Sequence, residues 1–136
     1  MSIAVDTNVL VRLLVHDDEA QCAAAQHSAA QRILDQASAA EEPVSIVLAA
    51  MLETEWVLRS RYKLDKTTIA GAFAALPEFS DVEFEHPPTM EEARHDCAQH
   101  SAADFADCLL TARAAHLGRS RFVTFDAGAA RLPGVK

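Results

Sequence analysis

Glycine and proline are scarce in this chain, with 4 and 5 residues among 136, while alanine is abundant. Because glycine and proline are the residues least compatible with a helix interior, this composition favours helices. Cysteine is also rare. Cys22, Cys97 and Cys108 are odd in number and far apart, so we expect reduced thiols of a cytoplasmic protein rather than a disulfide or zinc framework.

Long hydrophobic runs are absent as well. No apolar run approaches the ~20 residues that a membrane-spanning helix needs, and the longest candidate, residues 44–52, ends at Glu53. No basic segment precedes an apolar stretch at the N-terminus, so we expect no signal peptide. The length fits a single domain over residues 1–136, which is large enough to bury a core.

Positive charge is in the minority, since 12 Lys and Arg against 20 Asp and Glu give a net charge of −8. This balance argues against broad electrostatic adhesion to nucleic acid. It does not exclude a nucleic-acid enzyme, because a carboxylate site is acidic and bound divalent cations invert its local sign. It could also favour a basic peptide partner. The six histidines show no metal-binding spacing, and serine-hydrolase, P-loop and dinucleotide-binding motifs are missing.

Short apolar runs alternate with segments of helical periodicity. The expected strands are 3–5, 44–46, 82–84 and 121–125, and the expected helices are 8–15, 17–39, 48–61, 66–75, 90–99 and 101–118. Pro77 is expected to stop the fourth helix, Thr89 to cap the fifth and Ser101 to begin the sixth. This alternation predicts an α/β fold of three layers, with a central, mainly parallel sheet of four or five strands covered on both faces.

Two aspartates directly follow expected strands. Asp6 ends the run 3–5, and Asp126 ends the run 121–125. At the carboxyl edge of a parallel sheet, such a carboxylate can hold a hard cation in the crevice where ligands bind. Each residue also has a simpler explanation, since Asp6 can cap the following helix and Asp126 can form an Asx turn or a cap.

Two glutamates of the helix 48–61 are expected to differ. The helical neighbours of Glu53, three and four residues away, are all apolar, so we expect Glu53 on an inward face without a local cation. A carboxylate there needs a partner, a proton or a metal ion. Glu55 can instead pair with Arg59 four residues later, which is an ordinary surface arrangement, so we expect Glu55 to be solvated.

Asp104 and Asp107 are three residues apart and therefore share one face of a helix. Asp104 lies in the first turn of a helix that Ser101 begins, where a negative charge stabilises the helix dipole. Capping and metal ligation are equally good explanations for it. Asp107 lies one turn deeper, where no cap is needed, and this position favours ligation.

One function would account for four of these carboxylates together. If Asp6, Glu53, Asp107 and Asp126 converge in one pocket, they repel one another unless divalent cations are present. Oxygen ligands suit Mg²⁺ or Mn²⁺, whereas zinc would prefer histidine and cysteine. Arg59 and other cations near helix ends are possible phosphate contacts, although such residues are more often solvated.

With these residues the chain resembles the PIN domain family, and specifically VapC-type toxin ribonucleases. The resemblance rests on four segments in the family's order: VDTNVLVR at 5–12, LE and WVLRS within 52–60, ADFAD at 103–107 and FVTFD at 122–126. It implies four catalytic carboxylates that bind metal, a further acidic ligand and two supporting polar residues. The four catalytic, metal-binding carboxylates are Asp6, Glu53, Asp107 and Asp126. The further acidic ligand is Asp104, and the supporting polar residues are Asn8 and Thr124.

The resemblance also implies an activity and partners. It implies a Mg²⁺- or Mn²⁺-dependent endoribonuclease that cleaves RNA by metal-activated water, leaving a 5′-phosphate and a 3′-hydroxyl. It further implies a cytoplasmic homodimer that a VapB-type antitoxin neutralises by placing its tail in the acidic groove. Two alternatives stay open: a catalytically silent PIN-like module that binds RNA or protein, and a metal-dependent nuclease that acts on DNA.

Overall fold

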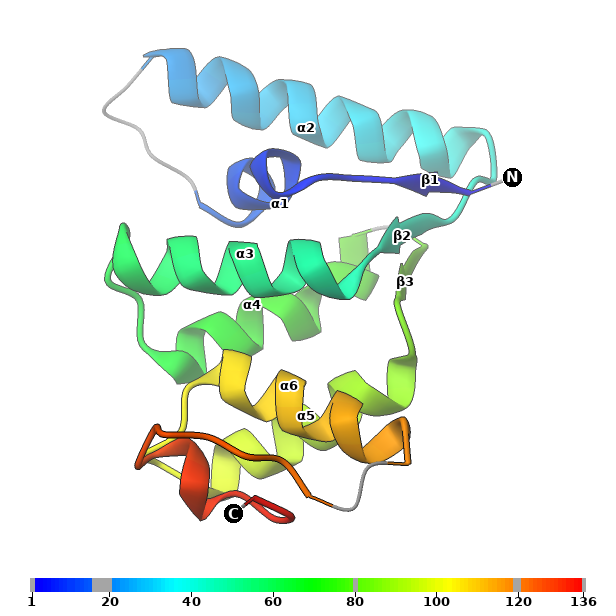
Figure 1. The fold of residues 1–136 in the computed structure, drawn as a ribbon. Coiled ribbons are helices and arrows are strands. Elements are labelled where there is room, and N and C mark those ends of the chain that lie inside the picture. Colours follow the sequence, from blue (N-terminus) through cyan, green and yellow to red (C-terminus); the bar gives the residue numbers. More distant parts are fainter. Residues whose placement is uncertain (1, 16–20, 80, 119–120, 136) are drawn as a thin grey trace.

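Helices and strands alternate in the computed structural model, which describes residues 2–15, 21–79, 81–118 and 121–135 (Figure 1). The elements in chain order are β1 (Ile3–Ala4), α1 (Thr7–Leu14), α2 (Gln21–Ala39), β2 (Val44–Ile46), α3 (Leu48–Ser60), α4 (Lys66–Phe79), β3 (Val82–Phe84), α5 (Pro87–Gln99), α6 (Phe105–His116) and the 3₁₀ helix η1 (Ala129–Arg131). The charged residues 17–19, expected to begin the second helix, lie outside the described residues.

The sheet is parallel, with the strand order β1-β2-β3. Ile3 pairs with Val44, and Val44 pairs with Val82. Parallel neighbours need long crossovers, and each connection here holds two helices: α1 and α2 between β1 and β2, α3 and α4 between β2 and β3. The α/β class and the parallel sheet are confirmed, and the arrangement is consistent with a three-layer α/β/α fold.

The predicted fourth strand is wrong. Within the described residues the sheet has three strands rather than four or five, and segment 121–125 makes a single parallel bridge, between Phe122 and Val135. The Phe122 N–H donates to the Gly134 carbonyl at 2.9 Å, so this segment pairs with the end of its own chain. Figure 1 shows the C-terminal segment beside α5 and α6, away from β1.

Within the described residues, three helix boundaries differ from the prediction by three residues or more. Pro77 lies inside α4, which continues to Phe79. Helix α5 begins at Pro87 and not after Thr89, because a proline in the first turn loses no intrahelical hydrogen bond. Helix α6 begins at Phe105 with Asp104 as its N-cap, four residues later than Ser101 suggested.

The core lies between the helices and the sheet. Its largest fully buried side chains include Phe73 of α4 and Phe105 of α6, whose rings stack with centroids 5.7 Å apart. Cys97 and Cys108 are buried free thiols, as expected for reduced cysteines. None of the described helices is both long and apolar enough to cross a membrane.

The aromatic pair should dominate the stability of this core. Phe73→Ala leaves a cavity beside Phe105 and should lower the free energy of unfolding by about 3–5 kcal/mol, measured by urea denaturation. Phe125→Ala removes the same atoms from a fully exposed position and should change the free energy of unfolding by less than about 0.5 kcal/mol. Equal losses in the two variants would contradict this description of the core.

Candidate functional site

Asp6 lies where β1 ends and α1 begins. It is the N-cap of α1, and its Oδ1 accepts a hydrogen bond from the Val9 N–H at 3.1 Å. The backbone at Asp6 is extended, as is usual for an N-cap. The simpler capping explanation is therefore confirmed. The cap uses one oxygen of Asp6 and fixes the carboxylate at the carboxyl edge of the sheet.

Glu53 lies on an exposed part of α3, which corrects the expectation of an inward face. Its Oε2 accepts a hydrogen bond from the Thr7 hydroxyl at 2.7 Å. One open cleft of about 370 Å³ is lined by Asp6, Thr7 and Glu53, together with small apolar residues around the end of β1 and the beginning of α3. The apolar neighbours of Glu53 in sequence did not bury it, because this part of α3 faces the beginning of α1.

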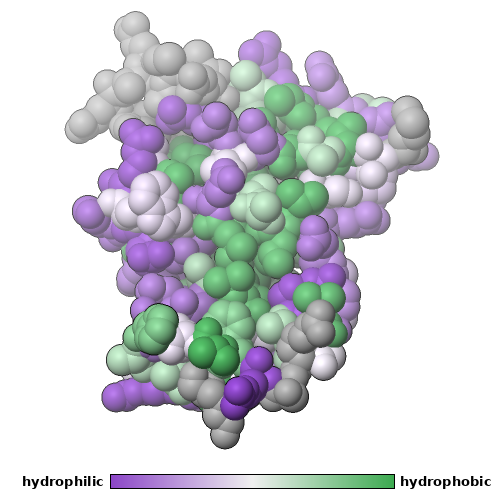
Figure 2. Space-filling model, in the orientation of Figure 1, coloured by the Kyte–Doolittle hydropathy of each residue, from purple (hydrophilic) through white to green (hydrophobic). Residues whose placement is uncertain are grey.

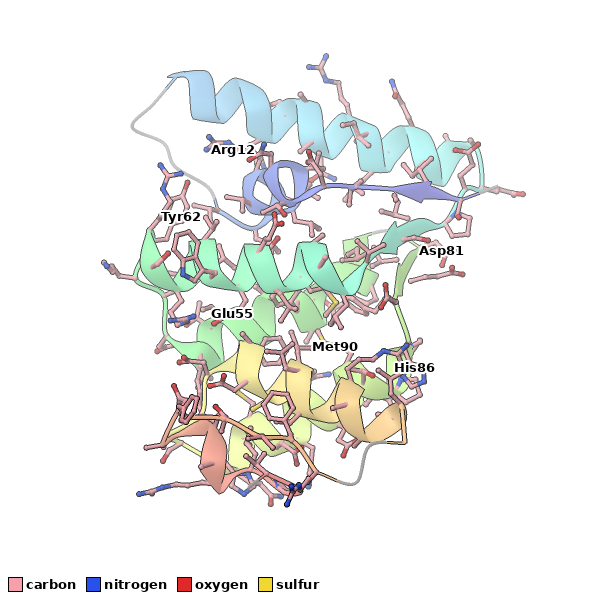
Figure 3. All side chains as sticks on the ribbon, viewed as in Figure 1. Arg12, Glu55, Tyr62, Asp81, His86 and Met90 are labelled. Atoms are coloured by element: carbon pink, nitrogen blue, oxygen red, sulfur yellow. The ribbon has the colours of Figure 1, made fainter. Side chains whose placement is uncertain are left out.

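Glu55 is fully buried, so the expectation of a solvated residue is wrong. The predicted pairing with Arg59 is present: Arg59 Nε donates to Glu55 Oε1 at 2.8 Å, and Arg59 Nη2 donates to Oε2 at 3.5 Å. Burial raises the pKa of Glu55, which the hydrogen bond from Arg59 partly offsets. Residues two apart on a helix do not share a face, so Glu55 lies opposite Glu53, toward the start of α6 (Figure 3).

Asp104 and Asp107 form the beginning of α6. The Asp104 N–H donates to Asp107 Oδ2 at 3.1 Å, so Asp107 satisfies a helix-end donor, contrary to the expectation that it has no capping role. Asp104 Oδ2 lies 3.7 Å from Arg59 Nη1. Burial raises the pKa of Asp107, the negative charges of Asp104 and Asp126 add to this, and the hydrogen bond from Asp104 opposes it.

Asp126 precedes η1. Its Oδ1 accepts a hydrogen bond from the Ala129 N–H at 2.9 Å, and its own N–H donates to the Thr124 hydroxyl at 3.0 Å. Asp126 thus binds the backbone a few residues ahead, as an Asx-type turn does, while the N-cap of η1 is Gly128. Thr124 is a direct partner of Asp126. At Gly128 a Cβ would collide with the carbonyl oxygen of Ala102. This close approach holds the turn after Asp126 against the loop that leads into α6.

The acidic residues thus form two groups. Asp6 and Glu53 share the first cleft, while Asp104, Asp107 and Asp126 interact electrostatically near the start of α6. Within the described residues, no three His, Cys, Asp or Glu side chains lie close enough to hold a metal ion. The expected convergence of the carboxylates in one pocket is therefore not found in the described part of the chain. The carboxylates have the donor chemistry that Mg²⁺ prefers but not the grouping.

Two further residues change the sequence-based description of the site. Asn8 lines a different cleft of about 340 Å³ between α1 and α2, together with Arg12, and so does not support the Asp6–Glu53 cleft. Thr7 does support it, and no feature of the sequence singled it out. The burial of Glu55 had a signal in the sequence, since Met51 and Leu58 lie four residues before and three after it.

A comparison with known protein families matches residues 3–135 to the PIN domain. This match covers nearly the whole chain, including both acidic groups. No curated protein is similar enough to the chain to give a match.

The raised pKa of Asp107 predicts a pH-dependent gain in stability on its replacement. Because the folded state raises the pKa above 3.8, the wild-type protein loses stability as the pH rises from there through the folded pKa. Asp107→Asn should therefore be more stable than the wild type at pH 7, and this difference should vanish below pH 3.8. Thermal unfolding followed at several pH values measures it.

Asp65→Asn provides a control of opposite sign. Asp65 accepts a hydrogen bond from the Thr68 N–H at 2.8 Å, and this bond lowers its pKa. Its ionised form therefore stabilises the folded state, and Asp65→Asn should be less stable than the wild type at pH 7. That deficit should fade as the pH falls through the lowered pKa. If both variants shift the stability in the same direction at pH 7, the assignment of the two environments is wrong.

Proposed function

The chain belongs to the PIN domain family, whose members are generally nucleases, and we propose that it is an endoribonuclease that requires Mg²⁺ or Mn²⁺. One observation carries the proposal. The cleft at the carboxyl edge of β1 holds Asp6 and Glu53 side by side, and ligands of open α/β sheets bind at this edge. A nuclease of this class needs no side-chain nucleophile, which agrees with a site made of carboxylates.

The roles of the residues follow from their contacts. Asp6 uses Oδ1 to cap α1, and Glu53 uses Oε2 to accept the Thr7 hydroxyl, so each carboxylate keeps a second oxygen for a ligand. The cap and the Thr7 hydrogen bond hold both side chains before any ligand arrives. A divalent cation, when bound, would activate water and offset the charge of a phosphodiester. Without a cation, the carboxylates repel the phosphates of RNA.

The second acidic group is proposed to complete the catalytic set. Asp107 and Asp126 would be catalytic and metal-binding with Asp6 and Glu53, Asp104 would be a further ligand, and Thr124 would orient Asp126 through its hydrogen bond. The support is their electrostatic coupling near α6 and the raised pKa of Asp107, which is typical of carboxylates at functional sites. Within the described residues the two groups are not brought together into one cluster.

The proposal includes a toxin role in the cytoplasm, with a VapB-type antitoxin as the partner that blocks the site. The net charge of −8 and the two acidic groups would favour a basic antitoxin segment.

The proposal of a homodimer is supported by exposed apolar surface. Trp56 is 56% exposed, and with Leu52 and Val57 it lines a cleft of about 440 Å³. Figure 2 shows that hydrophobic side chains also gather in a band along the middle of the face that it draws.

Cleavage of RNA tests the activity. Purified protein with total cellular RNA and Mn²⁺ or Mg²⁺ should give discrete fragments that end in a 5′-phosphate and a 3′-hydroxyl. Asp6→Asn and Asp107→Asn should abolish cleavage, and Thr7→Val should slow it by about 10–100-fold because it removes a hydrogen bond that orients Glu53. Glu83→Gln, at an exposed position of β3, is the control and should cleave like the wild type.

Two results would overturn this function. Intact RNA in every lane, with folded protein and added metal, would favour a binding module without catalysis. A substrate series with 2′-deoxy substitutions separates the remaining alternative, because equal cleavage of the all-DNA strand would indicate a nuclease that acts on DNA.

Sedimentation measures the proposed dimer. Trp56→Ser replaces an exposed indole by a small polar side chain and should shift the protein toward the monomer, with an unfolding free energy per protomer that changes little. Arg61→Gln, at an exposed position five residues later, is the control and should leave the association unchanged. A wild-type protein that is monomeric at all concentrations would contradict the dimer.

A further inference from the structure

Arg59 lies among the carboxylates near the start of α6. Its Nε and Nη2 donate to Glu55 at 2.8 and 3.5 Å, and its Nη1 lies 3.7 Å from Asp104 Oδ2. All three guanidinium nitrogens are therefore directed to carboxylates. Because of this, Arg59 is poorly placed to contact a phosphate group, which was one interpretation of this residue from the sequence.

Glu55 holds Arg59 in this position. The Glu55 side chain is 1% exposed, whereas the Arg59 side chain is 38% exposed. An ionised carboxylate that is removed from water needs a counter-ion, and Arg59 is the cation that pairs with it across one helical turn. Because Glu55 has no access to solvent, the guanidinium is kept on the side of α3 that faces Asp104 and Asp107.

The charge of Arg59 matters to the second acidic group. The Asp104 N–H donates to Asp107 Oδ2 at 3.1 Å, so two carboxylates lie close together at the start of α6, where their like charges repel one another. A cation is therefore favoured at this place. In the described structure the guanidinium of Arg59 supplies that cation, and no three carboxylates are grouped as a metal ion would require.

We infer that Arg59 is a resident cation of this acidic group and that it competes with a divalent metal ion for Asp104 and Asp107. The inference rests on the proposed function for the metal ion itself. It explains why donors of the right chemistry do not form a metal site here. Glu55 acts as the positioning residue, since it determines where the guanidinium lies.

Binding of Mn²⁺ alone, without RNA, tests the inference. The full chain is titrated with Mn²⁺ and followed by calorimetry or by the loss of the free-ion electron paramagnetic resonance signal. Arg59→Gln removes the competing charge and should tighten Mn²⁺ binding by about tenfold or more, because unit charges a few ångströms apart interact strongly even in water. Adding Asp107→Asn to this variant should abolish the gain.

A double variant and a control keep the test interpretable. Arg59→Gln leaves Glu55 buried without a counter-ion and can unfold the protein, so Glu55→Gln with Arg59→Gln removes both charges and should also bind Mn²⁺ more tightly than the wild type. Arg61→Gln is the control, because it removes one positive charge, as Arg59→Gln does, but at an exposed position. It should leave Mn²⁺ binding near the wild-type value.

The outcomes separate this inference from the proposed function. Unchanged or weaker Mn²⁺ binding by both Arg59 variants overturns the inference, even where the wild type cleaves RNA. Tighter binding that depends on Asp107, in a protein that leaves RNA intact, supports the inference and contradicts the nuclease. If neither the wild type nor the Arg59 variants bind Mn²⁺, both are overturned.

Discussion

Helix α3 is the element on which the candidate site depends, because it packs against α1 on one side and α6 on the other. A helix in that position presents successive carboxylates to different neighbours. Glu53 meets Thr7 at the beginning of α1, and Glu55 meets Arg59 and the beginning of α6. The two acidic groups are thus linked through one turn of one helix, although they do not touch.

Much of this arrangement could be predicted from local sequence. The apolar run that stops at Asp6 predicted both the strand and the helix that Asp6 caps. Both predictions were correct because strand formation and capping here depend on a few neighbouring residues. Strands β2 and β3 were predicted for the same reason. Asp126 was expected after its apolar run as an Asx turn or cap, and that local role is what the structure shows.

What failed depended on contacts between distant segments. Residues 121–125 have strand-forming side chains, but composition does not specify a partner strand, and Phe122 pairs with Val135. Glu53 is exposed and Glu55 is buried, which is the reverse of the prediction. Apolar neighbours in the sequence indicate that a helix has an apolar face, but they do not indicate which other element covers that face. The beginning of α6 is an exception, because it was misplaced for a local reason: Asp104, with its N–H bound by Asp107 three residues later, forms a better helix start than Ser101.

The sheet itself has a consequence for how copies of this protein can associate. Its strands are only two or three residues long, so an edge such as β1 offers few backbone donors and acceptors to a strand from another chain. Recruitment of partners by extension of the sheet is therefore disfavoured. Recognition between molecules falls to side chains on the helices, where a change of one residue alters an interface without disturbing the hydrogen bonds of the sheet.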